Sequence, residues 1–403
     1  MQMAGDTREN IVIVGGGICG LATALALHRK GIRSLVLERS ECLRATGAAI
    51  ILHANGWRAL DQLGVASYLR HTAIPILSGQ FNSLNNNKLQ ELPVGKDELR
   101  CVKRTDLINI LADNLPHNTV RFGSDVVSIE LDPITSSTVL QLQDGTSLNA
   151  EVVIGCDGVN STISHMIGVT TKNIFNVCVV RGFTNYPDGH DFGSEFKLTK
   201  KDDVQVGLMP MTTNRVYWFI TQKYVSQDHK ISKSQKLIGD LAVASVKDFP
   251  GSIKEMVENC SLESLHFSEY LRYQAPWDIL RKSFRVGTVT VAGDAFHAMA
   301  PFIAQGGAAS LEDAVVLARC LARKTTLAGI PSGRGSSKMM VEEALDEYLK
   351  ERKPRVLRLS LQSYLFAKMH DISSKFIKFI CIVLMMILFS DSHGHTRYDC
   401  GSL

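Results

Sequence analysis

The residues best placed for chemistry lie between Gly287 and Ala322, where an acid, a glycine pair and a helix follow one another. Asp294 comes just after a strand predicted over Val289 to Ala292, at the edge where ligands of open α/β sheets bind. The pair Gly306-Gly307 precedes apolar residues at helical spacing, and a helix N-terminus offers partial positive charge and free N–H donors. Such a loop could hold a hydroxylated chain and a group that becomes negative, as a reduced flavin requires. An ordinary strand, loop and helix with Asp294 as a cap explains the same pattern.

The N-terminal part of the chain has the spacing G-x-G-x-x-G. A strand is predicted over Ile11–Val14, and Gly15, Gly17 and Gly20 follow it. A helix over Leu21–Lys30 and a second strand over Ile32–Leu37 come next, and this strand ends at the acid Glu38. Gly15 permits the tight turn, Gly17 lets a pyrophosphate approach the backbone, and Gly20 lets helix and strand pack closely. Glu38 stands where an acid binds the adenosine ribose. This combination predicts dinucleotide binding rather than a structural glycine turn, but a nicotinamide dehydrogenase would begin with the same unit.

Several basic residues follow this unit. Arg39, Arg44 and a turn containing Ala48 come next, and Arg104 opens a helix predicted over Leu107 to Leu115. Arginines at such places can pair with phosphate oxygens, although each is equally compatible with a solvated surface position. His53 could relay a proton, and a surface histidine is an equal alternative. No catalytic acid or base is assigned.

A third apolar strand, Val152 to Ile154, leads into a second acid. Asp157 and Gly158 follow that strand directly. Two strands therefore each deliver a carboxylate, Asp157 and Asp294, beside the glycine unit.

The order of these three motifs resembles the group A flavoprotein monooxygenases, which are single-component, FAD-dependent aromatic hydroxylases. The stretches LERS, RGF, YWF, LEDAVVLAR and the terminal YDCG are most similar to the plant monooxygenase 1-like branch. The resemblance covers nearly the whole chain. It implies a Rossmann-like FAD-binding domain of the glutathione reductase/PHBH type, an inserted mixed-sheet substrate domain and a helical C-terminus. It says little about the substrate.

Site residues follow from the resemblance, position by position. Cofactor binding is implied for Gly15, Gly17, Gly20, Glu38, Arg39, Arg44, Ala48, Arg104, Asp157, Gly158, Asp294, Pro301, Gly306 and Gly307. Asp294 would bind the ribityl chain, and the segment from Pro301 to Gly307 would pack against the isoalloxazine. The chain departs from the family at Ala298, Ala304 and Ala308, which replace a proline, a glycine and a small polar residue or cysteine. None of these changes removes a required charge.

The rest of the chain fits a substrate domain. We predict strands over Val177–Phe183, Glu195–Leu198, Val204–Met209 and Val216–Thr221. The expected FAD domain comprises residues 1–75, 101–174 and 278–360, the substrate domain residues 76–100 and 175–277, and a helical segment residues 361–403. The strands around Arg181 and Val216–Phe219 are the expected pocket walls, with Arg181 a candidate catalytic residue.

Composition restricts the remaining classes of function. The net charge is +4, from 44 basic and 40 acidic residues without a basic run, so we expect no nucleic-acid partner. Nine scattered cysteines lack metal-ligand spacing, so no metal site is expected and a cytoplasmic location is favoured. The apolar run Phe376 to Phe389 is too short to cross a bilayer, which takes about 20 residues. A buried C-terminal helix is the favoured interpretation; a lid over the pocket or a membrane-surface contact stays open.

The resemblance implies an enzyme in which NADPH or NADH, as a transient co-substrate, reduces FAD, and one atom of O2 enters an apolar or aromatic secondary metabolite through a flavin C4a-(hydro)peroxide. Two alternatives stay open at this point. One is Baeyer–Villiger-type or epoxidising oxygenation of a terpenoid-like ketone or alkene, and the other is a flavin reductase or oxidase without oxygen insertion. The substrate, the choice between NADH and NADPH, and the oligomeric state do not follow from the sequence.

Overall fold

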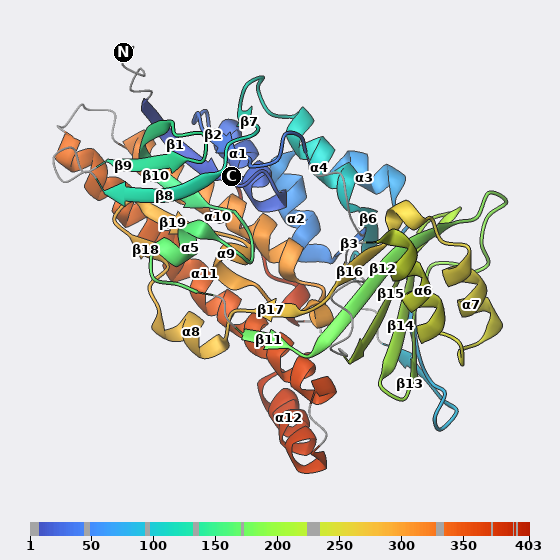
Figure 1. The fold of residues 1–403 in the computed structure, drawn as a ribbon. Coiled ribbons are helices and arrows are strands. Elements are labelled where there is room, and N and C mark those ends of the chain that lie inside the picture. Colours follow the sequence, from blue (N-terminus) through green and yellow to red (C-terminus); the bar gives the residue numbers. More distant parts are fainter. Residues whose placement is uncertain are drawn as a thin grey trace.

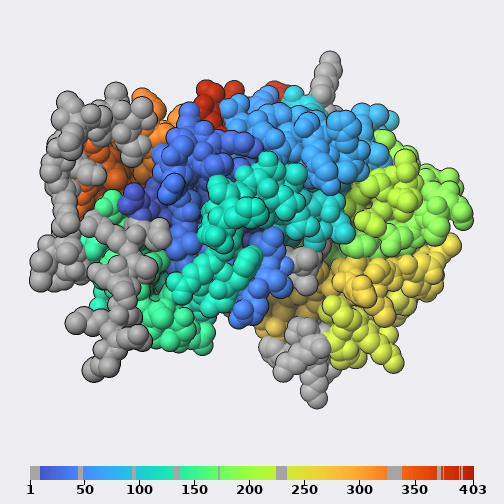
Figure 2. All heavy atoms as spheres, turned by 90° about the horizontal axis from the view of Figure 1, so that it is seen from above, coloured from blue at the N-terminus to red at the C-terminus, as the bar shows by residue number. Residues whose placement is uncertain are grey.

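The computed structural model describes residues 8–43, 49–92, 97–131, 137–170, 173–223, 234–327, 334–371, 374–389, 391 and 394–403. Within these residues the chain forms two large sheets with helices around them (Figure 1), as predicted for an α/β protein. Seen from above (Figure 2), the segment coloured lime to yellow, which includes β12 to β15, forms one end of the molecule. The predicted sites Arg44 and Ala48 lie outside the described residues.

The first sheet has eight strands in the described part of the chain, with the order β18-β19-β10-β1-β2-β7 and β8 and β9 joined to β10. Its strands are β1 (Arg8–Val14), β2 (Leu35–Leu37), β7 (Val120–Arg121), β8 (Val126–Leu131), β9 (Thr138–Leu142), β10 (Ser147–Gly155), β18 (Arg285–Val286) and β19 (Val289–Val291). The central pairs β1–β10, β1–β2 and β10–β19 are parallel. Their carboxyl ends therefore meet at one edge, where the three predicted motifs begin.

Helices cover this sheet and form the larger core with it. They include α1 (Ile18–Arg29), α2 (Ala54–Leu63), α3 (Ala66–Thr72), α4 (Arg104–Asp113), α5 (Thr162–Met166), α8 (Pro276–Arg281), α9 (Asp294–His297), α10 (Gly306–Leu327) and α11 (Arg334–Asp371). Helix α1 is buried along its whole length from Ile18 to Leu27, and it packs against α10. A helix apolar on every side belongs inside a protein, which explains why α1 shows no polar face.

The second sheet has seven strands among the described residues, in the order β16-β12-β15-β14-β13-β4-β5. They are β4 (Ser78–Ser83), β5 (Lys88–Leu92), β12 (Val177–Asn185), β13 (Glu195–Lys201), β14 (Val204–Thr212), β15 (Arg215–Lys223) and β16 (His266–Ser268). Helices α6 (Gln235–Ser245) and α7 (Gly251–Glu258) cover one face through a cluster that contains Trp218. The other face carries Met209, Tyr217 and Phe219, which pack with Ile76 and Cys101.

Two short pairs of strands join the sheets. They are β3 (Ala49–Leu52) with β6 (Arg100–Lys103), and β11 (Asn173–Phe175) with β17 (Leu271–Tyr273). The strands of the first sheet fall in the stretches predicted for the FAD domain, and those of the second in the stretches predicted for the substrate domain. The boundary predicted at residue 361 falls inside α11, which continues from Arg334 to Asp371.

The C-terminal region turns back on the body of the protein. Helix α12 (Lys375–Leu388) extends from the end of α11 away from both sheets (Figure 1). The expectation that this apolar run is buried is wrong, because most of its large side chains are exposed, with Phe376 at 71% and Ile387 at 69%. The last residues return to the first domain, where Arg58 Nη1 donates to the Arg397 carbonyl oxygen over 2.6 Å. None of the described helices is long and apolar enough to pass through a bilayer.

Candidate functional site

The turn between β1 and α1 has the shape that the glycine spacing predicts. Gly15 has a φ of 106°, and a Cβ there would lie 2.5 Å from the Cys156 carbonyl oxygen. A Cβ at Gly20 would overlap the carbonyl oxygen of Gly15. In contrast, no described atom lies within 4 Å of a Cβ built on Gly17. The loop is therefore closed at Gly15 and Gly20 and open at Gly17, where a phosphate could approach the N-terminus of α1.

Glu38 is held against this loop at the end of β2. Its Oε2 accepts a hydrogen bond from Gly16 N over 2.7 Å, and its Oε1 accepts one from Ser40 N over 2.9 Å. The carboxylate is therefore fixed beside the glycine loop, and its predicted contact with the adenosine ribose stays a prediction. The next residue, Arg39, is exposed at the surface.

Asp294 lies at the carboxyl end of the same sheet and faces the start of α10. It is exposed, and its Oδ1 is 3.9 Å from a Cβ built on Gly306, the first residue of that helix. Gly307 packs so closely on Ile50 that a Cβ there would overlap the isoleucine side chain. The helix N-terminus therefore points toward the carboxylate, as the sequence predicts. Pro301 is exposed in the short 3-10 helix η3 (Pro301–Ile303) before it.

Asp157 lies at the end of β10, and both of its carboxylate oxygens bind its own turn. Oδ1 accepts from Ser161 Oγ over 2.5 Å, and Oδ2 accepts from Thr162 N over 2.7 Å. Burial raises the pKa of Asp157, and these hydrogen bonds partly offset the rise. Gly158 has a φ of 85°, which suits glycine. The Asp-Gly motif thus shapes the loop, and its predicted contact with cofactors stays a prediction.

A buried ionic cluster supports the Asp294 loop from behind, and reasoning from the sequence missed it. Asp313 is fully buried on α10. Its Oδ2 accepts from Gly293 N over 2.8 Å and lies 2.7 Å from His297 Nε2, and its Oδ1 accepts from Arg352 Nε over 2.7 Å. Asp313 therefore fixes residues on both sides of Asp294. Burial raises the pKa of Asp313, but His297 and Arg352 outweigh this effect and the net shift is downward.

The neighbouring acid Glu312 extends the cluster toward the glycine pair. It forms ion pairs with Arg352 at 2.7 Å and Arg355 at 3.0 Å. Asn55 Nδ2 donates to Glu312 Oε1 over 2.6 Å and to Gln305 Oε1 over 2.7 Å. Gln305, the residue just before α10, is therefore held in place. Two adjacent acids next to the apolar stretch Ala314–Ala318 were the available signal, because buried charges need partners.

Arg181 lies on the face of the second sheet that also carries Phe219. It lies opposite Phe219 on β15 and His266 on β16, and its Nη2 donates to Ser268 Oγ over 3.2 Å. Burial lowers the pKa of His266, and Arg181 and Arg104 lower it further. Arg104 is the first residue of α4, whereas Arg181 is on β12, so the two arginines approach His266 from different elements.

Aromatic side chains surround this cation. Burial raises the pKa of Tyr217 to about 12 although Arg181 opposes the shift. Phe219 packs on Gly207, where a Cβ would overlap its ring, and it belongs to the same apolar cluster as Phe302 of the loop after Asp294. Trp218 points to the opposite face and is a core residue. Tyr217 and Phe219 therefore lie on the face that the sequence predicts as a pocket wall, and that role stays a prediction.

His53 is the residue that precedes α2. Its ring centroid is 6.1 Å from that of His395 in the C-terminal region. It therefore adjoins the C-terminal residues, and its role as a proton relay stays a prediction.

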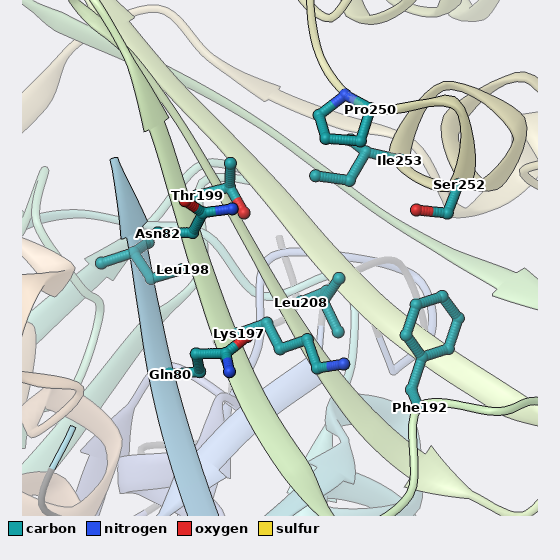
Figure 3. A pocket seen from close by; sticks show the side chains of 10 residues that line it. All are labelled: Gln80, Asn82, Phe192, Lys197, Leu198, Thr199, Leu208, Pro250, Ser252 and Ile253. Atoms are coloured by element: carbon teal, nitrogen blue, oxygen red, sulfur yellow. The ribbon is translucent and has the colours of Figure 1, made fainter. Parts of the chain in front are cut away.

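A further cavity of about 150 Å³ opens on the helix-covered face of the second sheet (Figure 3). Strands β4, β13 and β14 line it together with the start of α7, and Lys197 and Phe192 border it from the same side. It contains none of the predicted site residues, so the chemistry is not expected there.

Comparisons with known proteins agree with this geometry. Residues 8–362 match the family described as FAD binding domain. "Monooxygenase 1" of Arabidopsis thaliana is 48% identical over 398 residues, which cover 98% of this chain and 99% of that protein. "Monooxygenase 2" of the same plant is 36% identical over 414 residues and covers 100% of both chains. The structure of Klebsiella pneumoniae HpxO with FAD and uric acid has a TM-score of 0.76 at 20% identity and covers 99% of this chain and 97% of that one, which establishes the fold.

Proposed function

Because this chain belongs to the FAD binding domain family and is an FAD-dependent monooxygenase, we propose that it uses NAD(P)H and O2 to hydroxylate an aromatic secondary metabolite. The observation that carries the proposal is Arg181, which shares its face of the second sheet with Tyr217 and Phe219 beside the loop of Asp294 and approaches His266 together with Arg104.

The residues present fit FAD. Gly17 leaves room for a pyrophosphate at the N-terminus of α1, and the Glu38 carboxylate is held beside that loop, where a ribose hydroxyl could donate to it. Asp294 offers an exposed carboxylate to the ribityl hydroxyls. Gln305 Nε2 is buried without a hydrogen-bond partner among the described residues, next to the Gly306-Gly307 pair. A bound ligand at that pair would give this donor a partner.

Bound FAD would supply the redox chemistry, namely acceptance of electrons from NAD(P)H and activation of O2. The chain supplies position and electrostatics. The N-terminus of α10 at Gly306 would stabilise negative charge on the reduced ring, since its N–H groups lack helical partners. Phe219 and Phe302 would exclude water from the reacting atoms because they close the wall beside the loop.

The substrate proposed is an aromatic compound with an ionised oxygen, either a phenolate or a carboxylate. Arg181 would pair with that oxygen, and a charge-assisted hydrogen bond is strong where water is excluded. The lowered pKa of His266 keeps that ring neutral at pH 7, so Arg181 and Arg104 supply the charge. A terpenoid ketone or alkene has no negative charge to pair with this cation. The wall therefore favours hydroxylation over Baeyer–Villiger oxidation or epoxidation.

Steady-state kinetics with a panel of phenols, aromatic acids and uncharged ketones test the proposal. Arg181→Met should raise KM for the anionic aromatic substrate about 10- to 100-fold, since it removes one hydrogen bond to a charged group, with flavin content unchanged. Arg181→Lys is the matched control that keeps the charge and should recover part of the loss. Turnover of uncharged ketones alone, with equal KM in both variants, would refute the proposed substrate class.

A further inference from the structure

Helix α12 exposes apolar side chains around most of its circumference. Nine large ones are exposed among its 14 residues, namely Phe376, Ile377, Phe379, Ile380, Ile382, Leu384, Met386, Ile387 and Leu388. At 100° per residue these positions span an arc of roughly 240°. The remaining arc carries Cys381, Met385 and Phe389, which pack on Leu361 and Leu365 of α11. A helix apolar on all sides needs an apolar environment on all sides.

The charges near the exposed end of this helix are mainly basic, and the nearest acid is Asp371 at the end of α11. No acid occurs from Ser374 to Phe389, whereas Lys375 and Lys378 lie in the first turn of α12. Lys368 precedes them near the end of α11, where its Nζ lies 5.7 Å from the centroid of the Tyr364 ring. The end of the α11–α12 hairpin, which projects from the body in Figure 1, is therefore basic. Lysines beside an apolar helix suit anionic lipid headgroups.

We propose that α12 inserts into the surface of an anionic membrane and lies in its interface. Its 14 residues are about 21 Å long, and a hydrocarbon core is about 30 Å thick, so it cannot cross. A second copy of the chain or another protein would cover a stripe of the helix and leave the rest in water. A fluid lipid surface can surround the whole exposed arc, because acyl chains follow the shape of the helix.

The hairpin also adjoins the proposed substrate wall. Tyr364 of α11 and Met385 of α12 pack against the same apolar cluster, and the Tyr364 ring centroid lies 5.7 Å from that of Tyr273 and 6.1 Å from that of Phe175. That aromatic cluster continues to Phe219 and Phe302. An α12 seated in lipid therefore brings the substrate side of the protein to the membrane surface.

Vesicle flotation of the full-length, FAD-loaded protein tests this inference without a substrate. The wild type should float with phosphatidylcholine vesicles that contain 30% phosphatidylserine. The triple variant Phe376→Gln, Phe379→Gln and Ile387→Gln should lose at least about tenfold in partition, because each change removes an exposed apolar side chain. The matched control Leu77→Gln, Leu89→Gln and Leu280→Gln changes exposed side chains elsewhere and should float like the wild type.

Two further measurements decide the outcome. Lys375→Gln with Lys378→Gln should weaken flotation on anionic vesicles several-fold and leave phosphatidylcholine vesicles unaffected. Sedimentation velocity without lipid tests whether a second copy of the chain covers α12 instead. A wild type that does not float, or a self-association abolished by the α12 triple variant, would overturn the proposal. Flavin content and the unfolding midpoint verify the fold of each variant. If the triple variant fails to fold, the single change Phe379→Gln replaces it, and a smaller loss of vesicle partition is expected.

Discussion

Replacement of Asp313 by asparagine should destabilise the protein severely and loosen the flavin loop. Asp313 is fully buried and its carboxylate contacts three donors, Gly293 N, His297 Nε2 and Arg352 Nε. Asparagine has the same shape, but it brings an NH2 group against at least one donor and leaves Arg352 with less countercharge. Breaking a buried pair by removal of one partner costs about 3–5 kcal/mol, a large part of a typical stability of 5–15 kcal/mol.

Urea unfolding of the wild type and the variant, followed by flavin fluorescence and far-UV circular dichroism, measures this loss. Asp240→Asn on α6 is the matched control, because Asp240 is exposed and the change should stay within about 0.5 kcal/mol. FAD retention through gel filtration should fall for Asp313→Asn alone, since Gly293 and His297 flank Asp294. A loss of stability below 1 kcal/mol with full flavin content would refute the role of the cluster.

The same residue makes a pH prediction with a definite sign. Burial raises the pKa of Asp313, but His297 and Arg352 lower it more, so its folded pKa lies below the unfolded value of about 3.9. Its stabilisation is therefore fully present above that value and is lost as the pH falls through the folded pKa. The free energy of unfolding of the wild type should fall as the pH drops below about 4. That of Asp313→Asn should fall less over the same pH range. An equal loss of unfolding free energy at low pH in the two proteins would contradict this role of Asp313.

Three further changes test the site. Asp294→Ala should reduce FAD content after gel filtration with little change in the unfolding midpoint of the apoprotein, because the carboxylate is exposed; full flavin content would argue against its role. Ala304→Gly should stabilise the protein by about 0.5–1 kcal/mol in urea unfolding, since Ala304 has a φ of 49° where glycine is unstrained; a lower midpoint would contradict this reasoning. Gly207→Ala should displace Phe219 and raise KM for substrate while FAD content stays constant; an unchanged KM would remove Phe219 from the wall.

Local signals made the first half of the site predictable. The turn at Gly15 and Gly20 is fixed by backbone contacts that only glycine allows. Glu38 directly follows β2, which pairs in parallel with β1. Likewise, the Gly-Asp pair and the helix from Gly306 are neighbours in sequence and in space. Contacts of this kind, between residues close in the sequence, can be predicted from local sequence patterns.

The parts that depend on distant partners could not be predicted in the same way. Asp313 and Arg352 are 39 residues apart, and only the packing of α10 on α11 brings them together. Asp157 ends a strand as expected, but its oxygens bind Ser161 and Thr162, a local alternative that the motif alone did not exclude. For α12, apolar composition predicts a helix that avoids water, and it does not say whether protein or lipid covers it.

The most direct test of the central claim is the fate of labelled oxygen in a reaction with NADPH or NADH. The purified, FAD-loaded protein is incubated with 18O2 and the aromatic substrate that gives the lowest KM. The account predicts one 18O atom in the product, with one NAD(P)H and one O2 consumed for each product formed. Consumption of NAD(P)H and O2 without label in any product of the panel would contradict the claim that this chain inserts oxygen into an aromatic substrate.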